Sequence, residues 1–194
     1  MSRAAARRGI PFVVSGPSGV GKSTIVRRVL DADPLVRFSI SHTTRAPRAG
    51  EKNGVDYFFV GEPEFRGLIA NGAFLEYAVY QRHFYGTSRA AVDEPTAKGF
   101  DLILEVEMQG AEQLQVRLPD AVRVFIEPPS LDVLETRLRD RQTETEDVLR
   151  GRLQRAQEEL AYAKQCHHRI VNDSVDKAVS ALLQIIRDAR RDRG

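Results

Sequence analysis

The chain has 194 residues, of which 42% are hydrophobic and 29% are charged, and its formal net charge is +2. This length suits one well-packed domain, and the composition is ordinary for a soluble globular protein. The small net charge gives no reason to expect nucleic-acid binding, and no apolar run reaches the roughly 20 residues of a membrane span. The single cysteine, Cys166, excludes an internal disulfide and a cysteine-based metal cluster.

Residues 1–9 are rich in arginine and alanine and lack the apolar core of a secretory signal. We interpret them as a flexible basic tail. We therefore expect a cytoplasmic protein without a membrane or nucleic-acid partner.

A glycine-rich segment follows the first apolar run of the chain. Residues 16–23 read GPSGVGKS, the pattern G-x-x-x-x-G-K-[ST], between a predicted strand and a predicted helix. The glycines let successive N–H groups face a phosphate, and the helix adds its positive end. Lys22 would bridge the β- and γ-phosphates, and Ser23 would bind Mg²⁺. The sequence thus predicts a nucleoside triphosphate site, and its residues are Gly16, Pro17, Ser18, Gly19, Val20, Gly21, Lys22, Ser23 and Thr24.

Apolar strands and helical segments alternate along most of the chain. The predicted strands are 10–15, 37–40, 100–106, 122–126 and 168–171, and the predicted helices are 22–32, 88–98, 109–117, 130–140, 144–164 and 174–191. This alternation predicts an α/β fold, a parallel sheet flanked by helices, with ligands at the carboxyl ends of the strands. Pro95 should kink or shorten the helix in which it lies.

Residues 41–88 interrupt this alternation. Short alternating runs at 56–60 and 74–80 predict small antiparallel strands around a short helix near 62–70. We interpret the segment as an insertion that holds a second ligand. The alternative is a structural embellishment without a site.

These segments resemble the guanylate kinase family, whose members phosphorylate GMP with ATP. The likeness covers about residues 10–186, through the glycine-rich segment and 41–51, 53–60, 85–87, 105–110, 127–130, 143–146 and 171–173. The resemblance implies a P-loop NTPase fold in a single domain, 10–194. It implies a core of 10–40, 89–136 and 156–194, a small inserted mixed α/β GMP-binding subdomain at 41–88, and a helical lid at 137–155.

The resemblance also implies the acceptor site. Arg45, Arg48, Tyr57 and Tyr85 would hold the GMP phosphate, which suits two guanidinium forks and two phenols. Glu76 would accept from the imino and amino groups that guanine offers side by side, and Ser41 and Thr87 would donate to its carbonyl. The implied GMP-binding residues are Ser41, Arg45, Arg48, Tyr57, Glu76, Tyr85, Gly86, Thr87 and Glu107.

The implied catalytic residues are Lys22, Arg45 and the lid arginines Arg137, Arg141 and Arg152. Phosphoryl transfer needs mainly positioning and charge neutralisation, which arginines supply. Glu105 and Glu107 follow the apolar residues 102–104 at the end of a predicted strand, where a P-loop protein has acidic residues. We expect Glu105 to reach Mg²⁺ through water and Glu107 to face the acceptor base. Asn172 is implied to contact the adenine end of ATP, with a simple turn former as the alternative.

The leading hypothesis is transfer of the γ-phosphate of ATP to GMP, and also dGMP, in purine nucleotide metabolism and GMP recycling. One alternative is a catalytically inactive guanylate-kinase-like protein-interaction module, against which the intact Lys22 and Ser23 argue. Another is a kinase for a different monophosphate or a sugar phosphate, against which Ser41, Glu76 and Thr87 argue. Whether the protein is a monomer or a homodimer stays open.

Overall fold

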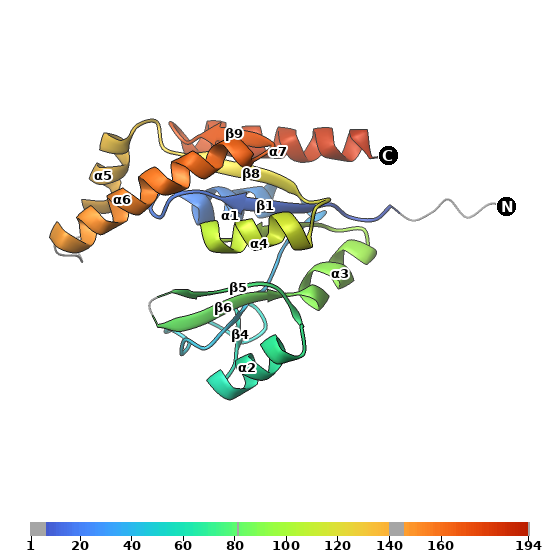
Figure 1. The fold of residues 1–194 in the computed structure, drawn as a ribbon. Helices are drawn as coiled ribbons and strands as arrows, with labels where there is room; N and C mark the ends of the chain where they lie inside the picture. Colours follow the sequence, from blue (N-terminus) through green and yellow to red (C-terminus); the bar gives the residue numbers. More distant parts are fainter. Residues whose placement is uncertain (1–6, 81, 140–145, 194) are drawn as a thin grey trace. The chain divides into compact units, whose positions relative to one another are not determined.

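Residues 7–80, 82–139 and 146–193 are described by the computed structural model shown in Figure 1. The chain divides into two units. The first contains Met1–Pro11, Leu35–Leu104 and Gln109–Ala121, and the second contains Phe12–Pro34, Glu105–Met108 and Val122–Gly194. No described helix is long and apolar enough to cross a membrane.

The larger sheet has five strands in the order β2-β7-β1-β8-β9. Its strands are β1 (Pro11–Ser15), β2 (Val36–Phe38), β7 (Asp101–Glu105), β8 (Val122–Glu127) and β9 (His168–Val171). The pairings β2–β7, β1–β8 and β8–β9 are parallel. The prediction of a parallel sheet flanked by helices is therefore confirmed.

The described part of the second unit also contains four helices, of which α7 contacts β9. They are α1 (Lys22–Ala32), α5 (Leu131–Arg139), α6 (Glu146–Tyr162) and α7 (Val175–Asp192), with a short 3₁₀ turn at Ala163–Gln165. β1 is buried along its whole length because apolar side chains occupy both of its faces. α1 and α7 contact each other, and both have buried apolar residues, such as Val29 on α1 and Leu182 on α7. α5 packs on α6 through Leu134, Leu138 and Leu149.

The first unit contains the smaller sheet, with the order β4-β3-β6-β5. Its elements are β3 (His42–Thr43), β4 (Phe58–Phe59), α2 (Glu62–Ala70), β5 (Phe74–Tyr80), β6 (His83–Ser88), α3 (Arg89–Ala97) and α4 (Met108–Arg117). The predicted antiparallel pairing holds for β3–β6 and β5–β6, but β4 pairs parallel with β3. The physical reason is the connection, because residues 44–57 are a long enough crossover to bring the chain back in the same direction.

Aromatic packing fixes α2 on the smaller sheet. The Phe65 ring stacks on the Phe74 ring with centroids 4.5 Å apart, and the Phe84 ring lies 5.3 Å from Phe65. Gly86 has no room for a side chain, since a Cβ there would lie 3.0 Å from both the Glu76 carbonyl oxygen and Phe65 Cζ. The glycine therefore lets β6 approach its neighbours closely.

α3 contains Pro95 and continues past it to Ala97. Proline has no backbone N–H, so α3 lacks the bond that residue 95 would donate to the Ala91 carbonyl, and the helix ends two residues later. The hydroxyl of Thr96 donates to the Val92 carbonyl (2.8 Å) in the same turn. The predicted range of 88–98 is thus close to the observed helix.

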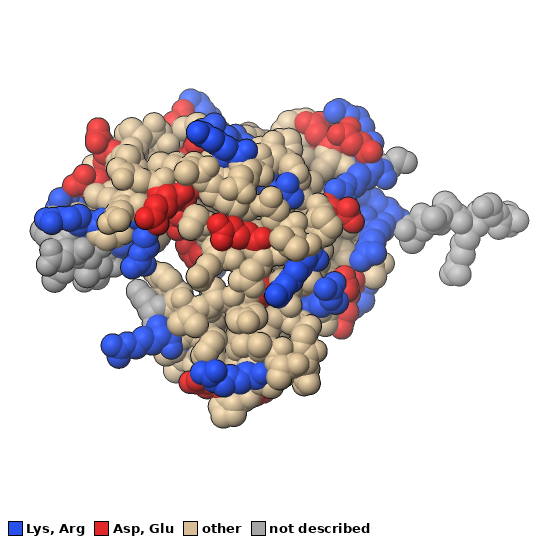
Figure 2. Space-filling model, in the orientation of Figure 1, with Lys and Arg blue, Asp and Glu red and all other residues tan. Residues whose placement is uncertain are grey.

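A buried carboxylate anchors the start of the described chain. Asp101 is fully buried, accepts from the Ile10 N–H (2.8 Å) and forms an ion pair with Arg7. Elsewhere the surface mixes charges of both signs, and Figure 2 shows acidic and basic side chains next to one another on the face drawn.

Candidate functional site

The glycine-rich segment forms a tight loop between β1 and α1. Gly16, Gly19 and Gly21 have φ values of 147°, 86° and 98°, a region that other residues rarely adopt. The N-cap of α1 is Gly21, which has no side chain that could accept from the first amides of the helix, and the first turn carries no acidic residue. The amides and the positive end of α1 are therefore available to an anion.

The ammonium group of Lys22 lies folded back over this loop. Its Nζ donates to the Gly16 carbonyl (2.5 Å) and to the Pro17 carbonyl (3.3 Å), and it lies 3.7 Å from a carboxylate oxygen of Glu107. The side chain is only 6% exposed. Two of these partners are neutral, so a phosphate would be a stronger partner for the same ammonium.

Ser23 and Glu105 form a hydroxyl–carboxylate pair beside Lys22. The Ser23 Oγ donates to Glu105 Oε1 at 2.7 Å. Burial raises the pKa of Glu105, and the Ser23 bond and the Lys22 charge oppose that rise. A hydroxyl and a carboxylate are oxygen ligands of the kind that Mg²⁺ prefers, directly or through water, so the pair fits the predicted metal.

Two of the predicted lid arginines lie against the loop. Arg137 on α5 donates to the Asn172 carbonyl (3.0 Å) and to the Val20 carbonyl (3.5 Å). Arg152 on α6 donates to the Ser18 hydroxyl at 2.9 Å. The third, Arg141, lies outside the described residues.

Asn172, which follows β9, is buried against the same loop. Its Nδ2 donates to the Val20 carbonyl at 2.7 Å, and the residue is 3% exposed. Its partner in the structure is therefore loop backbone, whereas the resemblance implies a contact with adenine.

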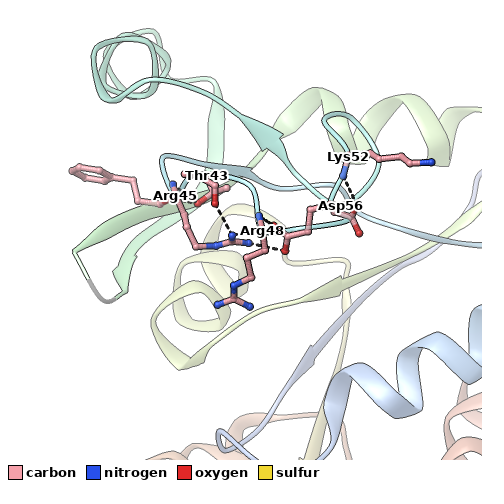
Figure 3. A network of polar contacts seen from close by, with 8 residues as sticks. Thr43, Arg45, Arg48, Lys52 and Asp56 are labelled. Atoms are coloured by element: carbon pink, nitrogen blue, oxygen red, sulfur yellow. Dashed lines mark hydrogen bonds and ion pairs between the residues drawn. The ribbon is translucent and has the colours of Figure 1, made fainter. Parts of the chain in front are cut away.

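Arg45, in the first unit, is held by a carboxylate from its own loop (Figure 3). Its Nη1 and Nη2 donate to the two carboxylate oxygens of Glu51 at 3.0 and 2.8 Å. Glu51 also accepts from the Arg48 N–H (2.7 Å), and Arg45 with this N–H holds the pKa of Glu51 below its usual value. Thr43 Oγ1 accepts from the Arg45 N–H (3.1 Å), so the loop is bonded at several points.

Two tyrosines adjoin this arginine. The Tyr57 ring centroid lies 5.5 Å from the Arg45 guanidinium carbon, and the Tyr57 and Tyr85 rings lie edge to face at 5.9 Å. A hydrogen bond with Tyr85 contributes, after that with Glu51, to raising the pKa of Arg45. The structure thus brings Arg45, Tyr57 and Tyr85 together, and Arg48 belongs to the same loop.

Glu76, Ser41 and Thr87 form a second polar group in this unit. Glu76 on β5 pairs with Thr87 on β6, and the two are 5% and 1% exposed. The Ser41 and Thr87 hydroxyl oxygens lie 3.1 Å apart. Burial raises the pKa of Glu76, and hydrogen bonds with Thr87 oppose that rise. The group can present one carboxylate and two hydroxyls to a single ligand.

Two residues escaped the sequence reasoning. Glu51 was part of the recognised segment, and an acidic residue in an arginine-rich loop was the signal for a pairing role. Glu159 gave no such signal. Burial, and after it the charge of Glu107, raise the pKa of Glu159 to about 7, while Lys22 opposes the rise.

A phosphate-binding loop between the first strand of a parallel sheet and a helix, ending in Lys22 and Ser23, defines a P-loop nucleotide-binding protein. The family model described as guanylate kinase matches residues 8–189. The chain belongs to the guanylate kinase family.

Its relatives cover nearly the whole chain. A guanylate kinase of Neisseria gonorrhoeae is 46% identical over 96% of this chain and 91% of its own length. A guanylate kinase of Rubrobacter xylanophilus is 46% identical over 93% of this chain and 95% of its own. The crystal structure of guanylate kinase from Anaplasma phagocytophilum matches with a TM-score of 0.75 and 30% identity, covering 94% of this chain and 87% of that one.

Proposed function

We propose that this protein is a guanylate kinase that transfers the γ-phosphate of ATP to GMP, and also to dGMP, giving ADP and GDP or dGDP. The relatives named above support this activity. The observation that carries it is the buried carboxylate of Glu76 beside the hydroxyls of Ser41 and Thr87. No observation favours the inactive interaction module.

The acceptor would be read by matched hydrogen bonds. An ionised Glu76 accepts from the imino and amino groups of guanine, and the two hydroxyls donate to its carbonyl oxygen. Adenine offers no such pair of donors, so it would leave a buried carboxylate short of partners. Arg45, Arg48, Tyr57 and Tyr85 would bind the GMP phosphate, with Glu51 holding Arg45 in place. We still expect Glu107 to face the guanine base, and Gly86 to let β6 approach its neighbours closely.

The donor would bind at the loop of residues 16–24. Lys22 would leave the Gly16 and Pro17 carbonyls for the β- and γ-phosphates. Ser23 and Glu105 would hold Mg²⁺, Glu105 through water, and the bound ion would neutralise phosphate oxygens. We expect this chemistry to need no general base, because positioning and charge neutralisation dominate phosphoryl transfer.

The lid arginines would supply the remaining positive charge. Arg137 and Arg152 are hydrogen-bonded to loop oxygens or to Asn172, which keeps both guanidinium groups next to the donor's predicted site. We retain 137–155 as the lid, with Arg141 among its catalytic residues, and 41–88 as the GMP-binding region. A cytoplasmic location and a monomeric or homodimeric state stay predictions.

The test is a coupled assay of ADP formation with GMP, dGMP, AMP, CMP and UMP, with and without Mg²⁺. We expect Mg²⁺-dependent turnover with the guanine nucleotides alone. Equal use of AMP, or no turnover, would refute the proposal.

Lys22→Ala examines the donor site, and Lys98→Ala, on the surface, is the control. Loss of a charged donor to the transferring phosphate should lower kcat about 10²- to 10³-fold. Full activity of Lys22→Ala would refute the role of Lys22.

A further inference from the structure

The carbonyl of Val20 is turned towards two side chains. It accepts from Asn172 Nδ2 at 2.7 Å and from Arg137 Nη1 at 3.5 Å. Val20 is itself fully buried. The peptide that joins Val20 to Gly21 is thus held from outside the loop.

The direction of that carbonyl decides where the next amide points. A trans peptide is planar, so its C=O and N–H point in opposite directions. Glycine populates both signs of φ at little cost, so a peptide beside glycine turns over easily unless something holds it. Gly21 has a φ of 98°. An anion cradle needs the N–H and not the C=O to face the ligand, so the orientation of this peptide needs an external partner.

Asn172 is rigidly placed to be that partner. It is 3% exposed, its own N–H donates to the Glu127 carbonyl (2.8 Å), and its carbonyl accepts from Arg137 (3.0 Å). A Cβ on Gly21 would lie 2.8 Å from its Nδ2, so the amide fills the space beside the glycine. A flipped amide would set Oδ1 against the Val20 carbonyl oxygen, so the orientation of the group follows from the contact.

We propose that Asn172 is a positioning residue that fixes the Val20–Gly21 peptide with its N–H turned towards the triphosphate and, through its own carbonyl, seats Arg137 beside it. The inference rests on the proposed function, since it concerns the same donor site. It differs from the adenine contact that the resemblance implies. On this proposal Asn172 affects binding of the triphosphate group, and its effect does not depend on which base the nucleotide has.

The experiment separates the two roles with a ligand that has no base. Binding of magnesium tripolyphosphate and of magnesium ATP is measured by calorimetry for the wild type and for Asn172→Ala. The Val20 carbonyl would keep only the longer bond from Arg137, so the variant should bind both ligands more weakly by a similar factor, about ten-fold or more. Wild-type affinity for tripolyphosphate with weakened ATP binding would overturn the proposal in favour of the base contact.

Two further variants keep the test decisive. Asn172→Asp keeps the shape of the side chain, but an ionised aspartate cannot donate to the Val20 carbonyl. This variant should therefore bind tripolyphosphate more weakly than Asn172→Ala does, and a thermal melt checks that it is folded. Asp173→Ala removes an exposed neighbour paired with Lys177 (2.8 Å) and should bind as the wild type does. A folded Asn172→Asp with wild-type binding would overturn the proposal.

Kinetics supply the last readout. The loss in kcat/KM should be the same for ATP and for other purine triphosphate donors, and a loss confined to ATP would contradict positioning. Wild-type turnover with GMP is measured in parallel. Its absence would refute the proposed kinase activity while leaving the tripolyphosphate result readable.

Discussion

Replacing Glu76 by glutamine removes one charge and changes almost nothing else in shape. The side chain is 5% exposed on β5, where it pairs with Thr87 on β6. A carboxylate can accept from both guanine donors, whereas a glutamine amide accepts with one atom and presents N–H to the second donor. With glutamine, guanine would therefore keep one hydrogen bond, and its second N–H would face the N–H of the amide instead of an acceptor.

The expected loss follows from these two contacts. A hydrogen bond to a charged group contributes about 1.5–3 kcal/mol, and a buried donor without an acceptor costs about 1–3 kcal/mol. Their sum, taken near the middle, is about 4 kcal/mol, or about 10³-fold in kcat/KM for GMP. AMP use should rise, because an amide can pair with the adjacent donor and acceptor of adenine.

The same substitution should lower activity with GMP but raise the stability of the folded protein. Burial raises the pKa of Glu76, so the folded protein carries a penalty once the pH exceeds the carboxyl's usual range. Glu76→Gln should therefore melt at a higher temperature than the wild type at pH 7.5, and the difference should vanish at pH 4.

The assay is steady-state turnover with GMP and AMP at saturating ATP, together with thermal melts. Glu62→Gln is the control, since Glu62 is an exposed glutamate of α2 paired with Arg66. A kcat/KM for GMP within about three-fold of the wild type, with no gain for AMP, would refute base reading by Glu76.

Glu51→Gln should raise the KM for GMP about ten-fold and leave the KM for ATP unchanged, because Arg45 loses the carboxylate that orients it. Steady-state kinetics measure both constants, and an unchanged KM for GMP would contradict the prediction. Glu159→Gln should stabilise the protein above about pH 7 and not below pH 4.5, because a folded-state pKa of about 7 makes ionisation in the folded protein unfavourable. Melts across pH check it, with Glu112→Gln, an exposed glutamate of α4, as control. A pH-independent difference would contradict it. Ser23→Ala should raise the Mg²⁺ concentration for half-maximal activity several-fold; a Mg²⁺ titration with an unchanged midpoint would exclude Ser23 as a ligand.

Much of the fold was predictable because its signals are local. β1 is buried on both faces and so reads as a continuous apolar run, and α1 follows it with apolar residues at helical spacing. The segment from Gly16 to Ser23 predicts the loop conformation directly, because its glycines can adopt the positive φ angles that the loop needs. Glu105 and Glu107 stand at and just after the end of an apolar run, and in the structure Glu105 is the last residue of β7, bonded to Ser23, while Glu107 lies beyond the strand, near Lys22.

The rest depends on contacts between distant segments. Asn172 bonds to a backbone carbonyl 152 positions away, and a carbonyl is present at every residue, so nothing in the sequence marks that partner. The pKa of Glu159 is raised because packing buries its carboxyl and, after that, places it near Glu107. The parallel pairing of β4 was missed for a similar reason, because a two-residue strand carries too little pattern to indicate its direction.

The buried Asp101 has a practical consequence for anyone who shortens or tags this protein. Removing residues up to and including Arg7 would take away the cationic neighbour of a fully buried acid that also accepts from the Ile10 amide. Such trimming should lower the melting temperature far more than loss of an exposed arginine suggests. Cleavage sites for purification therefore belong ahead of position 7.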